Sequence, residues 1–301
     1  MNSFLKPKVS VIIPSYNHAN FIRYALQSLL DQTYTNWEAI IIDNHSSDNT
    51  DEVVCKFKDP RIKLRKIFNN GVIAASRNMG IREAKGELIA FLDSDDWWDR
   101  QKLERVLDEI NNGADVVYHD LYIVRSLNQI FFNERIYSTK SNYPMFKSLL
   151  CNAMSIPNSS VIVRKELLIK IGGISENKNL ISVEDYDTWI KLSKLTEKFV
   201  RIPEALGYYW SGGGNISIAS PAQCNRIKFL YDQYMNELNL AQKKRARGFL
   251  AYRIARIAMS YGDRTKAQNF FLQAICSPIN LMFRIKSIYF FSTNMLLRFY
   301  Q

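Results

Sequence analysis

The sequence predicts an α/β protein with a mainly parallel sheet, helices on both faces of that sheet, and a helical region at its C-terminal end. Short apolar runs alternate with helix-like segments along the first 120 residues, which is the order that builds parallel sheets. The runs consist largely of isoleucine, valine, leucine and alanine, as expected for strands buried on both faces. Beyond residue 220 the pattern is helical throughout.

The individual elements follow from local patterns. Strands are expected over residues 9–13, 38–43, 62–67, 87–92 and 115–120. Helices are expected over residues 21–32, 51–57, 76–86 and 100–110. The region 121–220 is less regular, with a strand and a helix inside 159–173 and a helix that begins at Glu184 and Asp185. Two amphipathic helices then pair around the turn at Gly262 and Asp263. We expect a main domain over residues 1–220 and a helical, basic region over 221–301.

Four cysteines lie far apart, without the paired spacing of a zinc site, at Cys55, Cys151, Cys224 and Cys276. We expect reduced thiols, as in cytosolic proteins. Only a short apolar run precedes Pro14, so no export signal is expected, and no stretch has the roughly 20 apolar residues that a spanning helix needs. The expected location is the cytoplasm.

The positive charge is concentrated at the C-terminal end. The net charge is +11, and residues 224–301 hold thirteen Lys and Arg against three Asp and Glu, which is +10. The simplest interpretation is a solvated helical face. Residues 279–300, however, mix aromatic and aliphatic side chains with Arg284, Lys286 and Arg298, a composition typical of an interfacial helix on an anionic leaflet. We favour a peripheral contact with the cytoplasmic face of the inner membrane, and we expect no nucleic acid partner.

Three carboxylates directly follow the fourth predicted strand, at Asp93, Asp95 and Asp96. One aspartate there would cap the next helix, but three within four residues repel one another unless a cation lies among them. A divalent cation such as Mg²⁺ takes carboxylate oxygens and completes its shell with phosphate and water. Because open parallel sheets bind ligands at the carboxyl ends of their strands, the cluster predicts metal or phosphate chemistry at that edge.

Other polar residues follow the first two strands at the same edge. Pro14, Tyr16 and Asn17 come after the first strand, and Asp43 ends the second. Tyr16 is either a core aromatic or a ring stacked on a nucleobase, and we favour the stacked ring. Asp43 either caps a turn or accepts a hydrogen bond from a base or a ribose.

Two further candidates are ambiguous from the residues alone. Arg77 lies in the segment AASRN, where its guanidinium could clamp a diphosphate or form a surface ion pair. Glu184 and Asp185 either cap their helix or include a general base. The three histidines show no metal-ligand spacing, and no GxGxxG or GxxxxGK[ST] motif is present, which argues against a dinucleotide dehydrogenase and a P-loop NTPase.

Taken in order, the segments 9–50, 69–104 and 182–192 resemble the inverting family 2 glycosyltransferases of GT-A fold, and the match runs from about residue 8 to residue 217. The resemblance implies transfer of a sugar from a nucleotide diphosphate sugar, with a UDP-sugar favoured, to a hydroxyl of a saccharide or lipid-linked saccharide. It also implies help from Mn²⁺ or Mg²⁺, and a place in surface polysaccharide biosynthesis. The GT-A catalytic domain would occupy residues 1–220.

The resemblance assigns a role to each matched residue. On the nucleotide side, it implies that Pro14 and Tyr16 border the nucleobase, Asp43 contacts the nucleoside, Arg77 lies near the base or diphosphate, and Asp93 approaches the ribose. Asn17 would belong to the same nucleotide-sugar site. Asp95 would hold the metal, with Asp96 beside it. Asp185 would be the general base, oriented by Glu184.

The sequence departs from the family pattern at two places. Asn44 stands where many relatives have a second acid that contacts uracil, so the nucleobase stays open. Gly212–Gly214 replace a histidine that many relatives carry, so that loop would either hold phosphate through backbone N–H groups or hold it weakly. Two other function classes stay open, a sugar-phosphate nucleotidyltransferase and a non-catalytic membrane-binding module.

Overall fold

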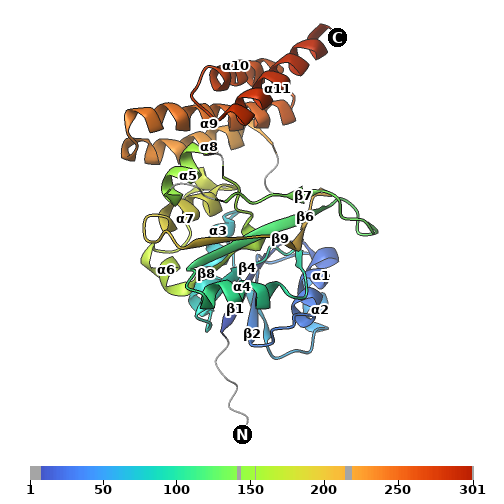
Figure 1. Ribbon diagram of the computed structural model, residues 1–301. Coiled ribbons are helices and arrows are strands. Elements are labelled where there is room, and N and C mark those ends of the chain that lie inside the picture. Colours follow the sequence, from blue (N-terminus) through green and yellow to red (C-terminus); the bar gives the residue numbers. More distant parts are fainter. Residues whose placement is uncertain (1–7, 141–143, 153, 214–218, 300–301) are drawn as a thin grey trace. The chain divides into compact units, whose positions relative to one another are not determined.

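The computed structural model describes residues 8–140, 144–152, 154–213 and 219–299, with side chains up to residue 293 (Figure 1). The chain forms two compact units. The first, called here the sheet unit, comprises Met1–Lys140, Ser155–Glu176 and Lys191–Gly214. The second, the helical unit, comprises Ser141–Met154, Asn177–Ile190 and Asn215–Gln301. The boundary expected at residue 220 stays a prediction.

The sheet unit carries all the described strands. They are β1 (Val9–Ser15), β2 (Trp37–Asp43), β3 (Ile62–Lys66), β4 (Leu88–Phe91), β5 (Trp97–Trp98), β6 (Val116–Val124), β7 (Arg135–Ile136), β8 (Ile162–Arg164) and β9 (Phe199–Trp210). Its helices are α1 (Ala19–Leu30), α2 (Thr50–Cys55), α3 (Ile73–Glu83), α4 (Lys102–Asn111), α6 (Lys165–Lys170) and the 3-10 turn η1 (Asn158–Ser160).

The described strands form one sheet in the order β3-β2-β1-β4-β8-β6-β9-β5, with β7 paired to β6. The run β3-β2-β1-β4 is parallel, as predicted, and β8 then joins β4 and β6 in antiparallel orientation. β6 and β9 pair in parallel, and β5 runs antiparallel to β9. The sheet is therefore a parallel half joined to a mixed half.

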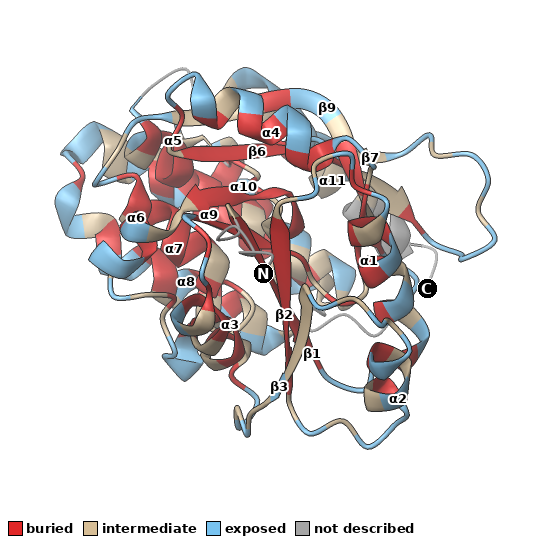
Figure 2. Ribbon diagram, turned by 90° about the horizontal axis from the view of Figure 1, so that it is seen from below, coloured by how far each residue is buried: buried red, intermediate tan, exposed pale blue. Residues whose placement is uncertain are grey.

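Helices cover both faces of the parallel half, which confirms the predicted fold class. Val9, Val11 and Ile13 of β1 share a buried core with the apolar faces of α1 and α4. Ile12 points to the opposite face, where a Cβ at Gly80 of α3 would lie only 2.6 Å from the Ile12 side chain. Figure 2 shows α3 on one side of β1 and β2, with α1 and α2 on the other. Gly80 therefore lets α3 approach the sheet closely, one turn after Arg77.

The sequence did not predict β9, a twelve-residue strand. Only some of its residues are buried, without strict alternation, and Pro203 interrupts the run. Its pairing with β6 also shifts register at His119 and Asp120. A partly exposed, irregular strand lacks the period that identifies buried strands.

The helical unit contains α5 (Met145–Cys151), η2 (Lys178–Leu180), most of α7 (Glu184–Leu192), α8 (Pro221–Tyr234), η3 (Met235–Glu237), α9 (Leu240–Ser260), α10 (Arg264–Ile275) and α11 (Leu281–Phe299). The predicted turn between α9 and α10 is present, with Gly262 at φ 89° and Asp263 capping α10 through the Lys266 N–H. The α9–α10 hairpin and α11 share a core that includes Phe249 and Phe271. None of the described helices is long and apolar enough to cross a membrane.

A buried carboxylate ties the sheet to the turn before β4. Glu38 of β2 is 3% exposed, and its carboxylate accepts hydrogen bonds from Ser10 Oγ at 2.7 Å, Lys63 Nζ at 2.6 Å and Lys85 N–H at 2.6 Å. Burial opposes the charge, but these hydrogen bonds outweigh it and lower the pKa of Glu38. A depressed pKa stabilises the fold above the pKa of the unfolded chain, and this stabilisation is lost as the pH falls through the folded value.

We therefore expect Glu38→Gln to lower the free energy of unfolding by about 1–3 kcal/mol at pH 7, because one buried hydrogen-bond acceptor becomes a mismatched amide. The difference should begin to shrink as the pH falls below the ordinary glutamate pKa of about 4.3, and it should keep shrinking until the pH has passed the lower pKa of the native carboxyl. Urea unfolding at pH 7 and at acid pH measures it. Glu83→Gln is the control, because Glu83 and Arg65 form a partly exposed pair at 2.7 Å and should change stability little. An equal loss at both pH values would contradict the electrostatic explanation.

Candidate active site

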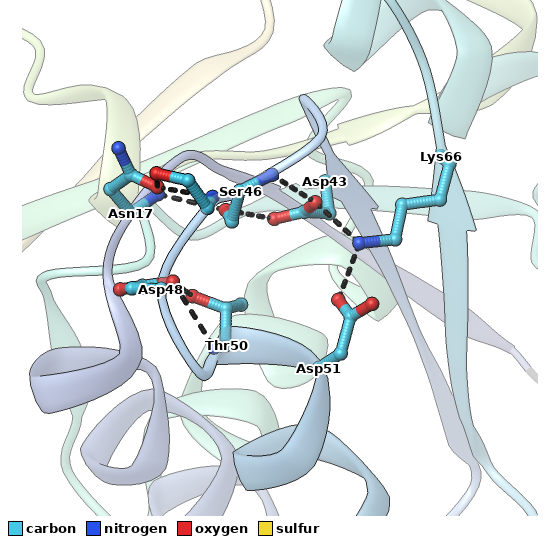
Figure 3. A network of polar contacts seen from close by, with 8 residues as sticks. Asn17, Asp43, Ser46, Asp48, Thr50, Asp51 and Lys66 are labelled. Carbon is cyan, nitrogen blue, oxygen red and sulfur yellow. Dashed lines mark hydrogen bonds and ion pairs between the residues drawn. The ribbon is translucent and has the colours of Figure 1, made fainter.

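The turn after β1 is fastened to the turn after β2. Asn17 has a positive φ of 52°, its backbone N–H donates to Ser46 Oγ at 2.8 Å, and its side-chain oxygen accepts from the Ser47 N–H at 2.8 Å (Figure 3). Pro14 lies within β1, opposite Ile42 of β2, and not after the strand as expected, because β1 continues to Ser15. Tyr16 is 55% exposed, which excludes a core role for its ring. The two turns therefore present an exposed aromatic ring on a fixed backbone.

Asp43 is a buried carboxylate held from two sides. It is fully buried at the end of β2 and accepts a hydrogen bond from the Ser46 N–H at 2.8 Å and another from Ser46 Oγ. Lys66 Nζ lies 2.8 Å from Asp43 Oδ2 and also pairs with Asp51 (Figure 3). Burial acts against the charge of Lys66, but Asp43 and Asp51 raise its pKa overall.

Sequence analysis missed Lys66. The signal was available in the strand alignment, since Lys66 of β3 stands directly opposite Asp43 in the parallel pairing of β2 and β3. A charged residue that ends one strand beside an acid that ends its neighbour predicts an ion pair at the sheet edge.

Asp48 has a structural role in the same network. One carboxylate oxygen accepts from the Ala19 N–H at 3.0 Å, and the other accepts from the N–H and hydroxyl of Thr50 (Figure 3). It therefore holds the first turns of α1 and α2 together. The neighbouring His18 ring nitrogen lies 2.7 Å from Ser94 Oγ, which links the turn after β1 to the loop that carries the three aspartates.

Arg77 and Asp93 form a direct ion pair. Arg77 Nη2 lies 2.8 Å from Asp93 Oδ1, and the Arg77 side chain is 5% exposed. Asn158 Nδ2 donates to the same carboxylate oxygen at 3.2 Å. The arginine of this pair is thus buried, which excludes the surface ion pair that the sequence left open for Arg77. α3 and the end of β4 bring these two predicted site residues together.

Asp96 is held by protein groups on both carboxylate oxygens. It is 2% exposed, accepts from Ser159 Oγ at 2.5 Å, and accepts from the Trp210 N–H at 2.9 Å. Ser159 Oγ also accepts from the Asp93 N–H at 3.1 Å. Burial, followed by the charges of Asp95 and Asp93, raises the pKa of Asp96 well above its usual range. Asp96 therefore joins the loop to η1 and β9.

Asp95 differs from the other two acids of this loop in its hydrogen bonding. Within the described ranges its carboxylate receives no side-chain hydrogen bond. Burial and then the Asp93 carboxylate raise its pKa to about 7, against the weaker effect of Arg77. Carboxylates this crowded gain most from a cation.

The residues fit a divalent cation only if the ligand supplies part of its shell. The described residues include no group of three or more His, Cys, Asp and Glu side chains that could hold a metal by themselves. Mg²⁺ and Mn²⁺ sites of one or two carboxylates completed by phosphate and water are common. Asp95, with the neighbouring acids, suits that type of site.

Glu184 and Asp185 begin α7, as predicted, and belong to the helical unit. Asp185 Oδ1 accepts from the Tyr186 N–H at 2.7 Å, and Glu184 is 5% exposed. The other predicted site residues all belong to the sheet unit. The expected phosphate loop at Gly212–Gly214 lies partly outside the described residues, since residues 214–218 are not described.

Known proteins share the sequence pattern of this chain. The model for glycosyl transferase family 2 matches residues 10–172, more than half of the 301 residues. WfgD of Escherichia coli, a UDP-Glc:alpha-D-GlcNAc-diphosphoundecaprenol beta-1,3-glucosyltransferase, is 35% identical over 187 residues, which are 62% of this chain and 70% of WfgD. TuaG of Bacillus subtilis, named a glycosyltransferase of teichuronic acid biosynthesis, is 42% identical over 105 residues, which are 34% of this chain and 42% of TuaG.

Solved structures share the fold. TarS 1–349 of S. aureus, in complex with UDP, has a TM-score of 0.62 at 21% identity, with 95% of this chain and 88% of that chain covered. The mannosyltransferase PcManGT of Pyrobaculum calidifontis, in complex with GDP-Man and Mn²⁺, has a TM-score of 0.62 at 16% identity, with 98% and 81% covered. With the family match, the parallel-then-mixed sheet and the acid loop after β4, these likenesses establish that the chain belongs to glycosyl transferase family 2 and has the GT-A fold.

Proposed function

We propose that this protein is an inverting glycosyltransferase that moves a sugar from a nucleotide diphosphate sugar to a hydroxyl of a saccharide or lipid-linked saccharide in surface polysaccharide biosynthesis. The observation that carries the proposal is the Arg77–Asp93 pair beside Asp95, at the carboxyl end of β4 in a family 2 chain. The names of WfgD and TuaG support the acceptor class and the pathway. Structures of TarS with UDP and UDP-GlcNAc support a UDP-sugar donor.

The turns after β1 and β2 would bind the nucleoside. The exposed ring of Tyr16, with Pro14 and Asn17 beside it, offers a flat surface for a base. The Asp43 carboxylate and the Lys66 ammonium offer an acceptor next to a donor. This combination suits a base edge in which an N–H adjoins a carbonyl, as in uracil or guanine.

The acid loop would bind the ribose and the diphosphate. Asp93, oriented by Arg77 and Asn158, is an acceptor for ribose hydroxyls. Asp95 would hold Mn²⁺ or Mg²⁺, and Asp96 would fix the loop that carries it. Such an ion, when bound, supplies positive charge that stabilises the departing diphosphate. Arg77 adds a fixed guanidinium next to the same acids.

Asp185 would accept the proton of the attacking hydroxyl. Asp185 is only partly buried in the first turn of α7, and its Oδ1 accepts the Tyr186 N–H at 2.7 Å, which helps to orient the carboxylate toward an alcohol. Glu184 would orient it. Attack on the sugar from the face opposite the diphosphate inverts the anomeric centre, and the nucleoside diphosphate leaves with the electron pair of the broken bond.

The helical unit would contact an anionic membrane through α11. One face of this helix carries exposed apolar side chains, at Leu281, Met282, Ile285, Ile288 and Tyr289. The opposite face packs Phe283, Phe290 and Phe291 against α9 and α10. The exposed Lys286 lies within this stretch, and residues 224–301 carry a net charge of +10. An apolar stripe on a basic helical region suits an anionic leaflet, where a lipid-linked acceptor would reside.

The proposed roles of Asp185 and Asp95 predict different losses of transferase activity when each is replaced by asparagine. Asp185→Asn should lower the rate of nucleoside diphosphate release by about 10²–10⁴-fold, since general bases contribute that much. Asp95→Asn should lower the rate and abolish its stimulation by Mn²⁺, and a chelator should inactivate the native protein. The assay measures nucleoside diphosphate release across a panel of nucleotide sugars with and without Mn²⁺.

Asp108→Asn is the matched control, because Asp108 is an exposed acid on α4 and should leave the rate unchanged. Full activity of Asp185→Asn would refute the base assignment, and full activity of Asp95→Asn in chelator would refute the metal role.

The membrane role predicts a loss of vesicle binding. Ile285→Asp places a charge in the centre of the apolar stripe, and its partition onto phosphatidylglycerol vesicles should fall at least about 10-fold, because a large apolar side chain no longer leaves water. Co-sedimentation measures the partition. Leu272→Asp on α10 is the control, since Leu272 is 51% exposed but outside the stripe. Equal recovery of native protein on phosphatidylglycerol and phosphatidylcholine vesicles would refute the anionic contact.

A further inference from the structure

The first turn of α7 is anchored by other elements of the helical unit. The Tyr186 hydroxyl donates to the Leu149 carbonyl at 2.5 Å and lies 3.2 Å from the Met154 carbonyl. The Tyr234 hydroxyl of α8 donates to Asp187 Oδ1 at 2.5 Å. Within the turn, Thr188 Oγ1 donates to the Glu184 carbonyl at 2.7 Å. These bonds fix the backbone on both sides of Asp185.

A buried cation from α9 lies against the same turn. The Arg253 guanidinium carbon is 4.6 Å from the centre of the Tyr186 ring. Arg253 Nη1 is shielded from solvent and makes no hydrogen bond to any residue that the structure describes. Burying a guanidinium with a nitrogen left unbonded is costly unless a nearby charge or ring compensates it. This free-energy cost indicates that the Arg253 charge has a role beyond packing.

The compensation for this cation comes from α7 and α8. Burial opposes the charge of Arg253, but Tyr231, Tyr186 and the Asp185 carboxylate raise its pKa overall. The two tyrosines are neutral near pH 7 and act as dipoles, whereas Asp185 brings a full negative charge. Arg253 therefore lies against the ring of Tyr186, the residue next to Asp185, and is stabilised by the Asp185 charge, although 68 positions separate Arg253 from Asp185 in the sequence.

We propose that Arg253 is a positioning residue for the transfer reaction, whose guanidinium holds the Tyr186 ring in place and balances the charge of the Asp185 carboxylate. The proposal rests on the proposed role of Asp185 as the base. It gives α9 a task in the chemistry that is separate from the membrane contact of α11. A carboxylate beside a fixed positive charge keeps its ionised form to lower pH, and only that form accepts a proton.

Other titratable groups near α7 also contribute to the electrostatic potential at Asp185 and Arg253. Titratable groups on the elements of this neighbourhood include Cys151 and Lys147 on α5, Glu184 and Asp187 on α7, Tyr231 and Tyr234 on α8, and Arg245 on α9. Arg245 Nε donates to the Cys151 carbonyl at 3.0 Å.

The test compares pH profiles of kcat/KM for the native protein, Arg253→Gln and Arg253→Lys, with a nucleotide sugar as donor and nucleoside diphosphate release as the signal. We expect Arg253→Gln to lower kcat about 10-fold or more and to move the acid limb upward by about one pH unit, the usual effect of losing one nearby opposite charge. Arg253→Lys should keep the acid limb near the native position, because the charge remains. The KM for the donor should change little.

Arg256→Gln is the matched control. Arg256 lies one turn further along α9, stacks on the Phe290 ring at 4.3 Å and donates to the Tyr252 hydroxyl at 3.2 Å, so it shares the chemistry of Arg253 but contacts different partners. It should leave both kcat and the acid limb unchanged. Thermal unfolding of each variant reports whether it is folded.

The outcomes separate this inference from the proposed function. If Asp185→Asn is inactive while folded Arg253→Gln keeps the native acid limb, Arg253 has no electrostatic role and the inference fails alone. If Asp185→Asn is active, the base assignment fails. Should Arg253→Gln unfold, Arg253→Met takes its place, and loss of folding with both neutral side chains would make Arg253 a residue of the fold and overturn the proposal.

Discussion

The site depends on one electrostatic constraint, the crowding of three carboxylates in a four-residue loop at the end of β4. Each carboxylate is accommodated differently. Asp93 is paired with Arg77. Asp96 is withdrawn from solvent and hydrogen-bonded by Ser159 and the backbone of Trp210. Asp95 remains with a raised pKa and no such partner among the described side chains. The protein therefore stabilises two of the acids with its own groups, and the proposed cation would offset the negative charge of the third, Asp95.

The helical unit uses charge in the reverse way. There the cation Arg253 is buried next to the acidic first turn of α7. The side chains of Tyr186 and Tyr231 help to stabilise its charge. Under the proposed roles, the two units would divide the chemical tasks that sugar transfer requires. One holds groups suited to the nucleotide and its diphosphate, and the other holds the groups suited to activating an alcohol.

Much of the fold was predictable because its strands are short, apolar and bounded by turns. β1, β2, β3, β4 and the start of β6 follow that pattern. β9 does not, since its burial is irregular. The acids and Arg77 were identified by type and position, but Lys66, Ser159 and Arg253 were not. Their importance arises from contacts across strands or between distant helices, and a linear sequence does not reveal such contacts without a register.

The fastening of Asn17 to Ser46 and Ser47 has a consequence for how a nucleotide would arrive. Because hydrogen bonds already join the two turns, these turns would lose little conformational entropy when a ligand binds. If the Tyr16 ring stacks on the base, its binding surface is already formed in the free protein. The free energy of the ligand's contacts is then not offset by the cost of ordering these turns. Recognition of the base would then resemble docking onto a rigid surface, and any slow closing step would belong to another part of the enzyme.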